Sequence, residues 1–253
     1  MENRAPQGLL TEPRIARTRP RVPVVLRALT ETAVARGLPL LDGGRGFAAS
    51  TKPADGLLYV GQAQGEAAFA SFASSLVLKR EGAPIPLRSF LPELQALQRQ
   101  TSEAFKPPRS VALHERFIAL NSALKLAQEL DAQKSCAGAL YQYLEATRHF
   151  AMLDAPPVEP ARQQGLKARI SLMNEKLSLS GSDSSLAVLF LERAASQTDH
   201  SVGSAPSPDE WRSAQVILDS VVPAYLAAQK SAVALPPTGV KSVQLTLVRW
   251  PYT

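Results

Sequence analysis

The sequence is poor in the residues that carry most recognisable chemistry. Its 253 residues include one cysteine, Cys136, so neither an intramolecular disulfide nor a cysteine-based zinc site can form. No histidine has a second ligand at a His-x-x-x-His or Glu-x-x-His spacing; the three are His114, His149 and His200. We interpret Cys136 as a small packing residue and the histidines as ordinary surface or partly buried side chains. The sequence therefore predicts no catalytic, cofactor-binding or metal-binding residues.

Long apolar runs are absent too. A membrane-spanning helix needs about 18 or more consecutive apolar residues, and the most apolar stretch, residues 216–235, is interrupted by Asp219, Pro223 and Lys230. The first 21 residues lack the apolar centre of a secretory signal. We therefore expect a soluble protein that is cytoplasmic by default. A periplasmic or exported location stays open if the true start or a leader is missing.

Aromatic residues make up only 6% of the chain, while alanine and leucine are abundant, a mixture that favours helices over β-sheets. The 45% of apolar residues is typical of a globular protein. We predict an all-α fold, a helical bundle or repeat-like array of about seven helices. One short C-terminal strand is expected where Val243, Leu245 and Leu247 alternate with polar residues.

The helices are placed by apolar residues that recur near every 3.6 positions. Ser110 is the expected N-cap of the longest pattern, which Gly138 divides, Asp183 is the expected cap of the sixth helix, and Pro223 is expected to kink the last. Between the first two helices, a long loop is predicted with turns at its glycines. The expected helices cover approximately residues 22–36, 57–80, 89–105, 110–153, 166–177, 183–193 and 208–235, and the glycines are Gly43, Gly44 and Gly46.

Proline-rich segments and charge suggest the domain organisation. Six arginines and two glutamates give residues 1–27 a net charge of +4, out of +6 for the whole chain. We predict a flexible, Arg- and Pro-rich arm over residues 1–21, an N-terminal helical lobe over 22–106, a C-terminal helical lobe over 109–235, and an extended tail over 240–253.

Three short motifs match known functional patterns in part. Ser122 and Lys125 have the Ser-x-x-Lys spacing of penicillin-recognising hydrolases, but the accompanying Ser-Asp-Asn and Lys-Thr-Gly elements are absent. The GGRG segment at 43–46 lacks the Lys-Ser/Thr of a phosphate-binding loop. Pro20-Arg21-Val22-Pro23 fits a short polyproline ligand. We interpret the first as a coincidence on a helix surface and the second as a turn.

A longer segment, residues 138–157, resembles the second helix of a tetratricopeptide repeat. That family places an alanine, a large aromatic residue four positions later and then a proline that ends the unit; here Ala146, Phe150 and Pro156 or Pro157 approximate this pattern. The glycine and tyrosine of the first helix are replaced by Lys134 and Ala137, so the likeness covers about half a repeat. The resemblance implies a helical hairpin that contacts other proteins.

These observations leave three hypotheses for function. The first is a non-enzymatic helical scaffold or protein-protein interaction module, and the second is a binder of acidic polymers, nucleic acid or anionic surfaces through the basic arm. The third is an enzyme whose site is not visible as a motif. An enzyme is the less favoured class, and the oligomeric state is left open. The expected partner contacts are Arg17, Arg19 and Arg21 in the arm and Trp250 and Tyr252 in the tail.

Overall fold

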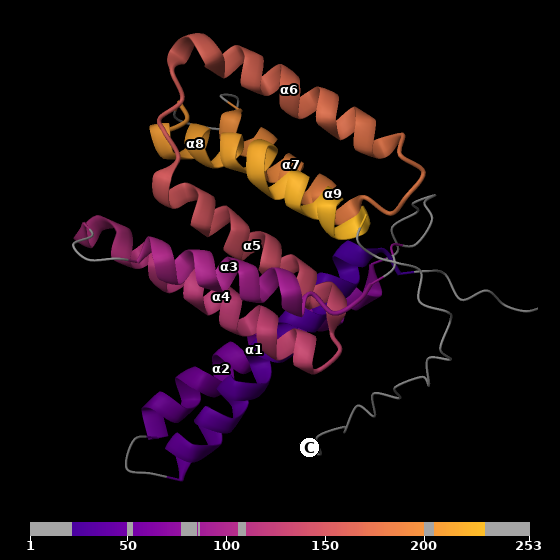
Figure 1. Ribbon diagram of the computed structural model, residues 1–253. Helices are drawn as coiled ribbons and strands as arrows, with labels where there is room; N and C mark the ends of the chain where they lie inside the picture. The colour runs from indigo at the N-terminus through magenta and orange to yellow at the C-terminus, as the bar shows by residue number, and fades with distance from the viewer. Residues whose placement is uncertain are drawn as a thin grey trace, which may run out of the picture.

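A computed structural model describes residues 22–49, 53–76, 85, 87–105, 110–199 and 205–230. Every regular element in these residues is a helix, which confirms the all-α class (Figure 1). The predicted arm, the strand within 240–253 and the lobe boundary at Pro107 and Pro108 lie outside the described residues. The elements are α1 (Val24–Ala48), α2 (Pro53–Ser75), α3 (Leu91–Ala104), a 3-10 turn η1 (Val111–Leu113), α4 (His114–Ala132), α5 (Cys136–Asp154), α6 (Pro160–Ser178), α7 (Ser185–Thr198), α8 (Pro208–Val216), a π-helical turn η2 (Ile217–Val221) and α9 (Val222–Lys230).

Helix α5 lies at the centre and packs against α4 and α1 on one side and against η2 and α8 on the other. The apolar stripe predicted for the longest helical pattern faces this core, as Phe117, Leu120, Leu124, Leu140 and Leu144 are all buried. Burial of one large apolar side chain stabilises the folded state by roughly 1.5–3 kcal/mol. Burial of this stripe therefore fixes α4 against α5.

The C-terminal helices form a layer over α5, with α6 outermost (Figure 1). Trp211, Ile217 and Tyr225 on α8, η2 and α9 are buried in the common core. Close to Pro223, where a kink is predicted, the α-helical pattern is interrupted by the π-helical turn η2, which ends at Val221. Proline has no backbone N–H, so a helix cannot keep its regular hydrogen bonds through such a residue.

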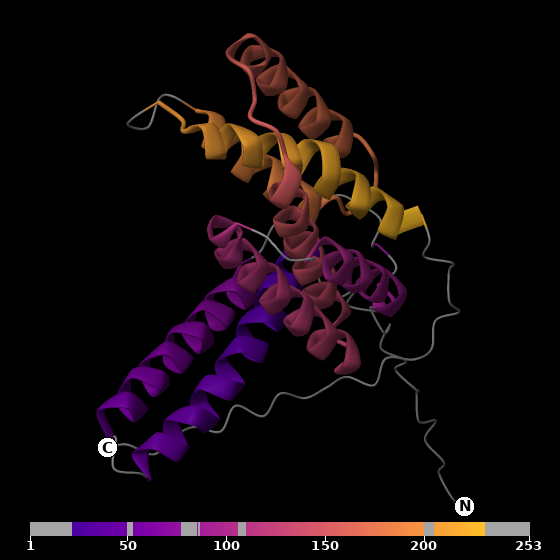
Figure 2. The same ribbon diagram turned by 60° about the vertical axis from the view of Figure 1, so that its left-hand side comes forward.

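The predicted loop between the first two helices is wrong. Helix α1 continues through Gly37, Pro39 and Gly44 to Ala48, and α2 already begins at Pro53. The two helices form a hairpin that projects from the rest of the molecule (Figure 2). A Cβ at Gly44 would lie 2.7 Å from Cγ2 of Val60 and 3.2 Å from the carbonyl oxygen of Gly56, so this glycine is needed for close approach of the helices.

The division predicted at Gly138 is displaced. Helix α4 ends at Ala132 and α5 begins at Cys136; in the connection between them, Lys134 has a φ of 61°. Gly138 lies inside α5, where its N–H donates to Glu31 Oε2 at 2.7 Å and a Cβ would be 3.0 Å from the Glu31 Cβ. The glycine therefore marks a close crossing of α1 and α5 and not a helix end. The N-cap predicted at Ser110 is also wrong, because Ser110 precedes η1 and α4 begins at His114.

Asp183 joins three helices that are distant in sequence. Its Oδ2 accepts a hydrogen bond from the backbone N–H of Val24 at 2.7 Å, and its Oδ1 accepts one from the N–H of Ser185 at 3.1 Å. Its backbone carbonyl accepts one from the Tyr225 hydroxyl at 2.7 Å. Asp183, which is predicted as a cap, thus accepts hydrogen bonds in the first turn of α7 and from the first N–H of α1. The N-cap position of α7 itself is Ser184. Pro23, the N-cap of α1, offers no side-chain acceptor.

Gly44→Ala should separate α1 from α2, since the new methyl group would overlap Val60, whereas Gly46→Ala should not. A Cβ at Gly46 meets nothing within 4 Å. Alanine is more favourable than glycine in a helix interior by about 1 kcal/mol, so Gly46→Ala should raise the free energy of unfolding by up to that amount. Urea denaturation of both variants checks this. Equal effects of the two substitutions would contradict the close contact at Gly44.

Asp183→Ala should lower the free energy of unfolding by about 2–3 kcal/mol, because the N–H of Val24 and that of Ser185 lose an ionised acceptor. Asp42→Ala is the control, since the Asp42 side chain is 79% exposed and its distance to Arg45 is 3.7 Å. Exposed pairs of this kind contribute at most about 1 kcal/mol. Thermal and urea unfolding measure both. A loss at Asp183 no larger than that at Asp42 would show that the junction does not hold α1.

Candidate functional site

A cavity of about 550 Å³ lies where α1, α4, α5 and α7 meet, and we call it the arginine cavity. Arg36 comes from α1, Arg148 from α5 and Arg193 from α7. Together with Ala119, Ser122, Ala123, Leu126, Tyr141, Gln142, Glu145 and His149, these three arginines form its lining.

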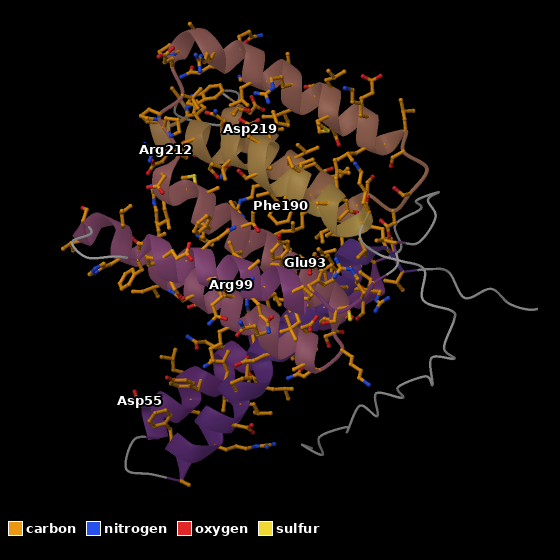
Figure 3. All side chains as sticks on the ribbon, in the orientation of Figure 1. Asp55, Glu93, Arg99, Phe190, Arg212 and Asp219 are labelled. Carbon is orange, nitrogen blue, oxygen red and sulfur yellow. The ribbon has the colours of Figure 1, made fainter. Side chains whose placement is uncertain are left out.

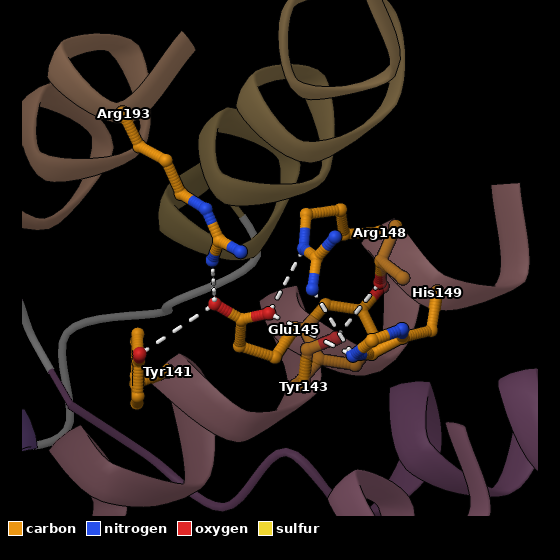
Figure 4. A network of polar contacts seen from close by, with 7 residues as sticks. Tyr141, Tyr143, Glu145, Arg148, His149 and Arg193 are labelled. Carbon is orange, nitrogen blue, oxygen red and sulfur yellow. Dashed lines mark hydrogen bonds and ion pairs between the residues drawn. The ribbon is translucent and has the colours of Figure 1, made fainter. Parts of the chain in front are cut away.

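Glu145 organises the charged groups of the cavity (Figure 4). Its Oε2 accepts a hydrogen bond from Arg148 Nε at 2.9 Å, and its Oε1 accepts one from Arg193 Nη1 at 2.9 Å. The Tyr141 hydroxyl approaches the same Oε1 at 3.5 Å. Only 12% of the Glu145 side chain is exposed, so both arginines are needed to compensate the loss of water around the carboxylate.

The cavity keeps an excess of positive charge. Glu145 is the one carboxylate in its lining, against three arginines. Burial and the adjacent Arg148 cation lower the pKa of His149 to about 4, so this imidazole is neutral at pH 7. Neutral His149 can accept a hydrogen bond from Arg148 Nη2, which lies 3.1 Å from its Nε2. Arg36 is exposed and forms no ion pair with the described part of the chain.

Gln142 also lines the cavity. The residue is 2% exposed, and its buried Nε2 has no hydrogen-bond partner among the described residues. A buried polar group that lacks a partner costs roughly 1–3 kcal/mol. The arginines also retain donors, because the contacts above use one nitrogen of Arg193 and two of Arg148, out of three in each guanidinium.

The residues predicted to contact partners cannot be placed in this site. Arg17, Arg19, Arg21, Trp250 and Tyr252 lie outside the described residues. Ser122 lines the arginine cavity, but the Lys125 side chain is 80% exposed and lies 3.9 Å from Glu129. The Lys125 ammonium group thus pairs with Glu129 on the exposed side of α4.

Part of the site could be recognised in the sequence. Tyr141, Glu145 and Arg148 recur at helical spacing, with Gln142 and His149 beside them, so the α5 residues of the site share one face. Apolar periodicity drew attention to Leu140 and Leu144 on the same helix instead. Arg36 lies in α1 and Arg193 in α7, 48 residues after Glu145, so their convergence on α5 depends on tertiary packing.

Other features of the described residues are less well equipped. A second cavity of about 420 Å³ is lined by Phe105, His114, Phe117, Ile118, Asn121 and Ser122, without a charged acid or guanidinium. No group of three or more His, Cys, Asp or Glu residues in the described ranges is arranged to hold a metal ion. Burial raises the pKa of the Cys136 thiol, which disfavours its nucleophilic thiolate form. Within the same ranges, no helix has the length and apolar character that crossing a bilayer requires.

Comparison of the chain with protein-family models, with curated proteins and with solved structures finds no match in any of the three. Function must therefore be argued from the geometry of this chain.

His149→Gln should make folding less sensitive to acid. Because the folded pKa of His149 is about 4 and an unfolded histidine has a pKa near 6.5, the unfolded chain binds more protons between these values. The contribution of neutral His149 is present above pH 6.5 and is lost as the pH falls toward 4. Glutamine can still accept from Arg148 and does not titrate. The urea midpoint, measured at pH 7 and pH 4.5, should fall less in the variant. An identical fall in both proteins would contradict the buried, neutral histidine.

Proposed function

We propose that this protein is a non-enzymatic helical interaction module, and that the arginine cavity binds the carboxylates of an acidic segment in a partner protein. The observation that carries the proposal is the convergence of Arg36, Arg148 and Arg193 on a cavity that contains one carboxylate. Guanidinium groups bind carboxylates through paired N–H donors, and partial burial strengthens such contacts. A volume of about 550 Å³ is large enough for one or two side chains of a peptide.

The contacts of Glu145 support a binding role for the arginines of the cavity. It holds Arg148 and Arg193 in place before a ligand arrives, so less side-chain entropy is lost on binding. Arg36 is then the guanidinium that is free to complete the contact.

The repeat-like character of the α4–α5 hairpin belongs to the same proposal. Ala146 is fully buried in α5, Phe150 packs against the core, and Pro156 and Pro157 follow the end of the helix at Asp154. These positions support a helical hairpin of the kind that tetratricopeptide repeats use. The basic arm gives a second candidate function, binding of acidic polymers through Arg17, Arg19 and Arg21, which rests on charge alone.

Fluorescence anisotropy with a labelled hexaglutamate peptide tests the proposal. The full chain should bind this peptide more tightly than hexaglutamine, and Arg36→Gln should weaken binding by about 5- to 20-fold, in keeping with loss of one charge-assisted contact. Arg36 is exposed, so the substitution should leave stability unchanged. Arg162→Gln on α6 is the matched control, because the Arg162 side chain is 79% exposed and remote from the cavity.

A deletion of residues 1–21 separates the two candidate functions. Binding that survives the deletion and falls with Arg36→Gln supports the cavity. Binding that disappears with the arm but is unaffected by Arg36→Gln would instead favour the second candidate and would contradict the first.

A further inference from the structure

Helix α2 is apolar on the face that points away from its neighbour. Among the described elements its extensive contact is with α1, through Ala63, Ala70 and Ala73. The apolar face of a helix normally packs against another element. The opposite face, which we call the outer face of α2, carries exposed residues at helical spacing: Leu57, Leu58, Gly61, Gly65, Ala68, Phe69 and Phe72.

The outer face of α2 is unusually large and uncharged for a solvated surface. Leu57 is 74% exposed, Leu58 60%, Phe69 44% and Phe72 60%. At about 200 Å² for each whole side chain, these four leave roughly 480 Å² of apolar surface in water. Asp55 and Glu66 are the only charged residues in α2, and at 100° per residue both fall outside the apolar arc. Asp55 lies toward the outer end of the hairpin (Figure 3).

Two glycines in the middle of this face make no close contact with other described elements. A Cβ at Gly61 or at Gly65 would meet nothing within 4 Å. Glycine is less favourable than alanine inside a helix, and neither residue lets α2 approach α1. Close approach of another helix would explain both, because small residues shorten the distance between helix axes.

We propose that the outer face of α2 pairs with the same face of a second copy of this chain, so that two α1–α2 hairpins form a four-helix contact. The face is self-complementary in an antiparallel arrangement. Its leucines lie at one end, its phenylalanines at the other and its glycines between them, so each leucine pair meets the phenylalanine pair of the other copy. A two-fold axis then passes close to Gly65. The four large side chains of one copy and the four of the other would together bury about 1,000 Å², which is close to the smallest total area of a specific interface.

The absence of charge on the outer face is consistent with this occupant. A charge close to the two-fold axis would meet its own copy and a charge elsewhere would be buried against an apolar side chain, but the outer face of α2 carries no charge at any position. The inference is independent of the arginine cavity, whose lining contains no residue of α2.

Sedimentation velocity of the full-length protein tests the proposal directly. The wild-type chain should be a dimer at micromolar concentration. Leu58→Glu combined with Phe72→Glu should raise the dimer dissociation constant at least about 100-fold, since charges would be buried at the interface, and should leave the helical circular dichroism of the monomer unchanged. Leu172→Glu is the control, as Leu172 is 51% exposed on α6, and this variant should remain dimeric.

A cross-linking experiment tests the position of the axis. Cys136 is the only cysteine in the chain, so Cys136→Ser gives a background in which Gly65→Cys is the single thiol. Mild oxidation should convert this variant to a disulfide-linked dimer much faster than Ser171→Cys on α6 in the same background, because disulfide formation requires Cβ atoms about 3.5–4.5 Å apart.

Several results would overturn the proposal. These are a monomeric wild-type protein at about 100 µM, a double variant that stays dimeric, or equal cross-linking at positions 65 and 171. A monomer that dimerises only when residues 231–253 are deleted would make the tail the occupant of this face. A monomer that binds vesicles of neutral phospholipid through Leu58 and Phe72 would make it a lipid surface.

Discussion

The junction at Asp183 is the contact on which the arrangement of the helices depends. The first turn of α1 needs acceptors for its N–H groups, and Pro23 provides none from its side chain. Two residues about 160 positions later provide them: Asp183, which precedes α7, accepts from the N–H of Val24 at 2.7 Å, and Ser185, the first residue of α7, accepts from that of Val25 at 3.2 Å. The start of α1 is therefore tied to the start of α7, and the two helices that carry Arg36 and Arg193 hold a fixed relation.

Glu145 repeats this logic in the interior. A largely buried carboxylate on the central helix is stable only with cationic donors, and the structure supplies one from α5 and one from α7. The ion pair consequently positions two arginines beside a cavity that they do not fill. Stability and binding capacity arise from the same residues, so Glu145 cannot be replaced without losing the arrangement of both guanidinium groups.

Apolar periodicity was sufficient to predict the helices that bury one face. The stripe from Phe117 to Leu144 is buried, as are the regularly spaced α6 residues Leu166 and Ile170. The same reasoning fails for α1, which is expected to end near residue 36 but continues through Gly37, a residue that lies beside α2. Gly138 misled in the same way, since the contact with Glu31 that requires it spans 107 residues. Whether a glycine ends a helix or permits close packing depends on its tertiary partner, which sequence spacing does not reveal.

The site was less predictable than the fold for a related reason. The residues of α5 at 141, 145 and 148 share a helical face, but nothing local indicates that Arg36 and Arg193 converge on it. Those contacts follow from the crossing of α1 over α5 and from the capping of α1 by Asp183. The sequence instead directs attention to the concentrated charge of the arm, where arginines are adjacent in the chain and need no fold to bring them together.

Helix α1 connects the two surfaces proposed for binding. Arg36 borders the arginine cavity, while the next residue, Gly37, lies against α2, where an added Cβ would be 3.4 Å from the Glu66 Cβ. Arg36 and Gly37 thus mark the point on α1 at which the helix leaves the rest of the molecule and enters the α1–α2 hairpin. Helix α1 therefore belongs to both surfaces, and its position, which the junction at Asp183 fixes, sets where each of them lies.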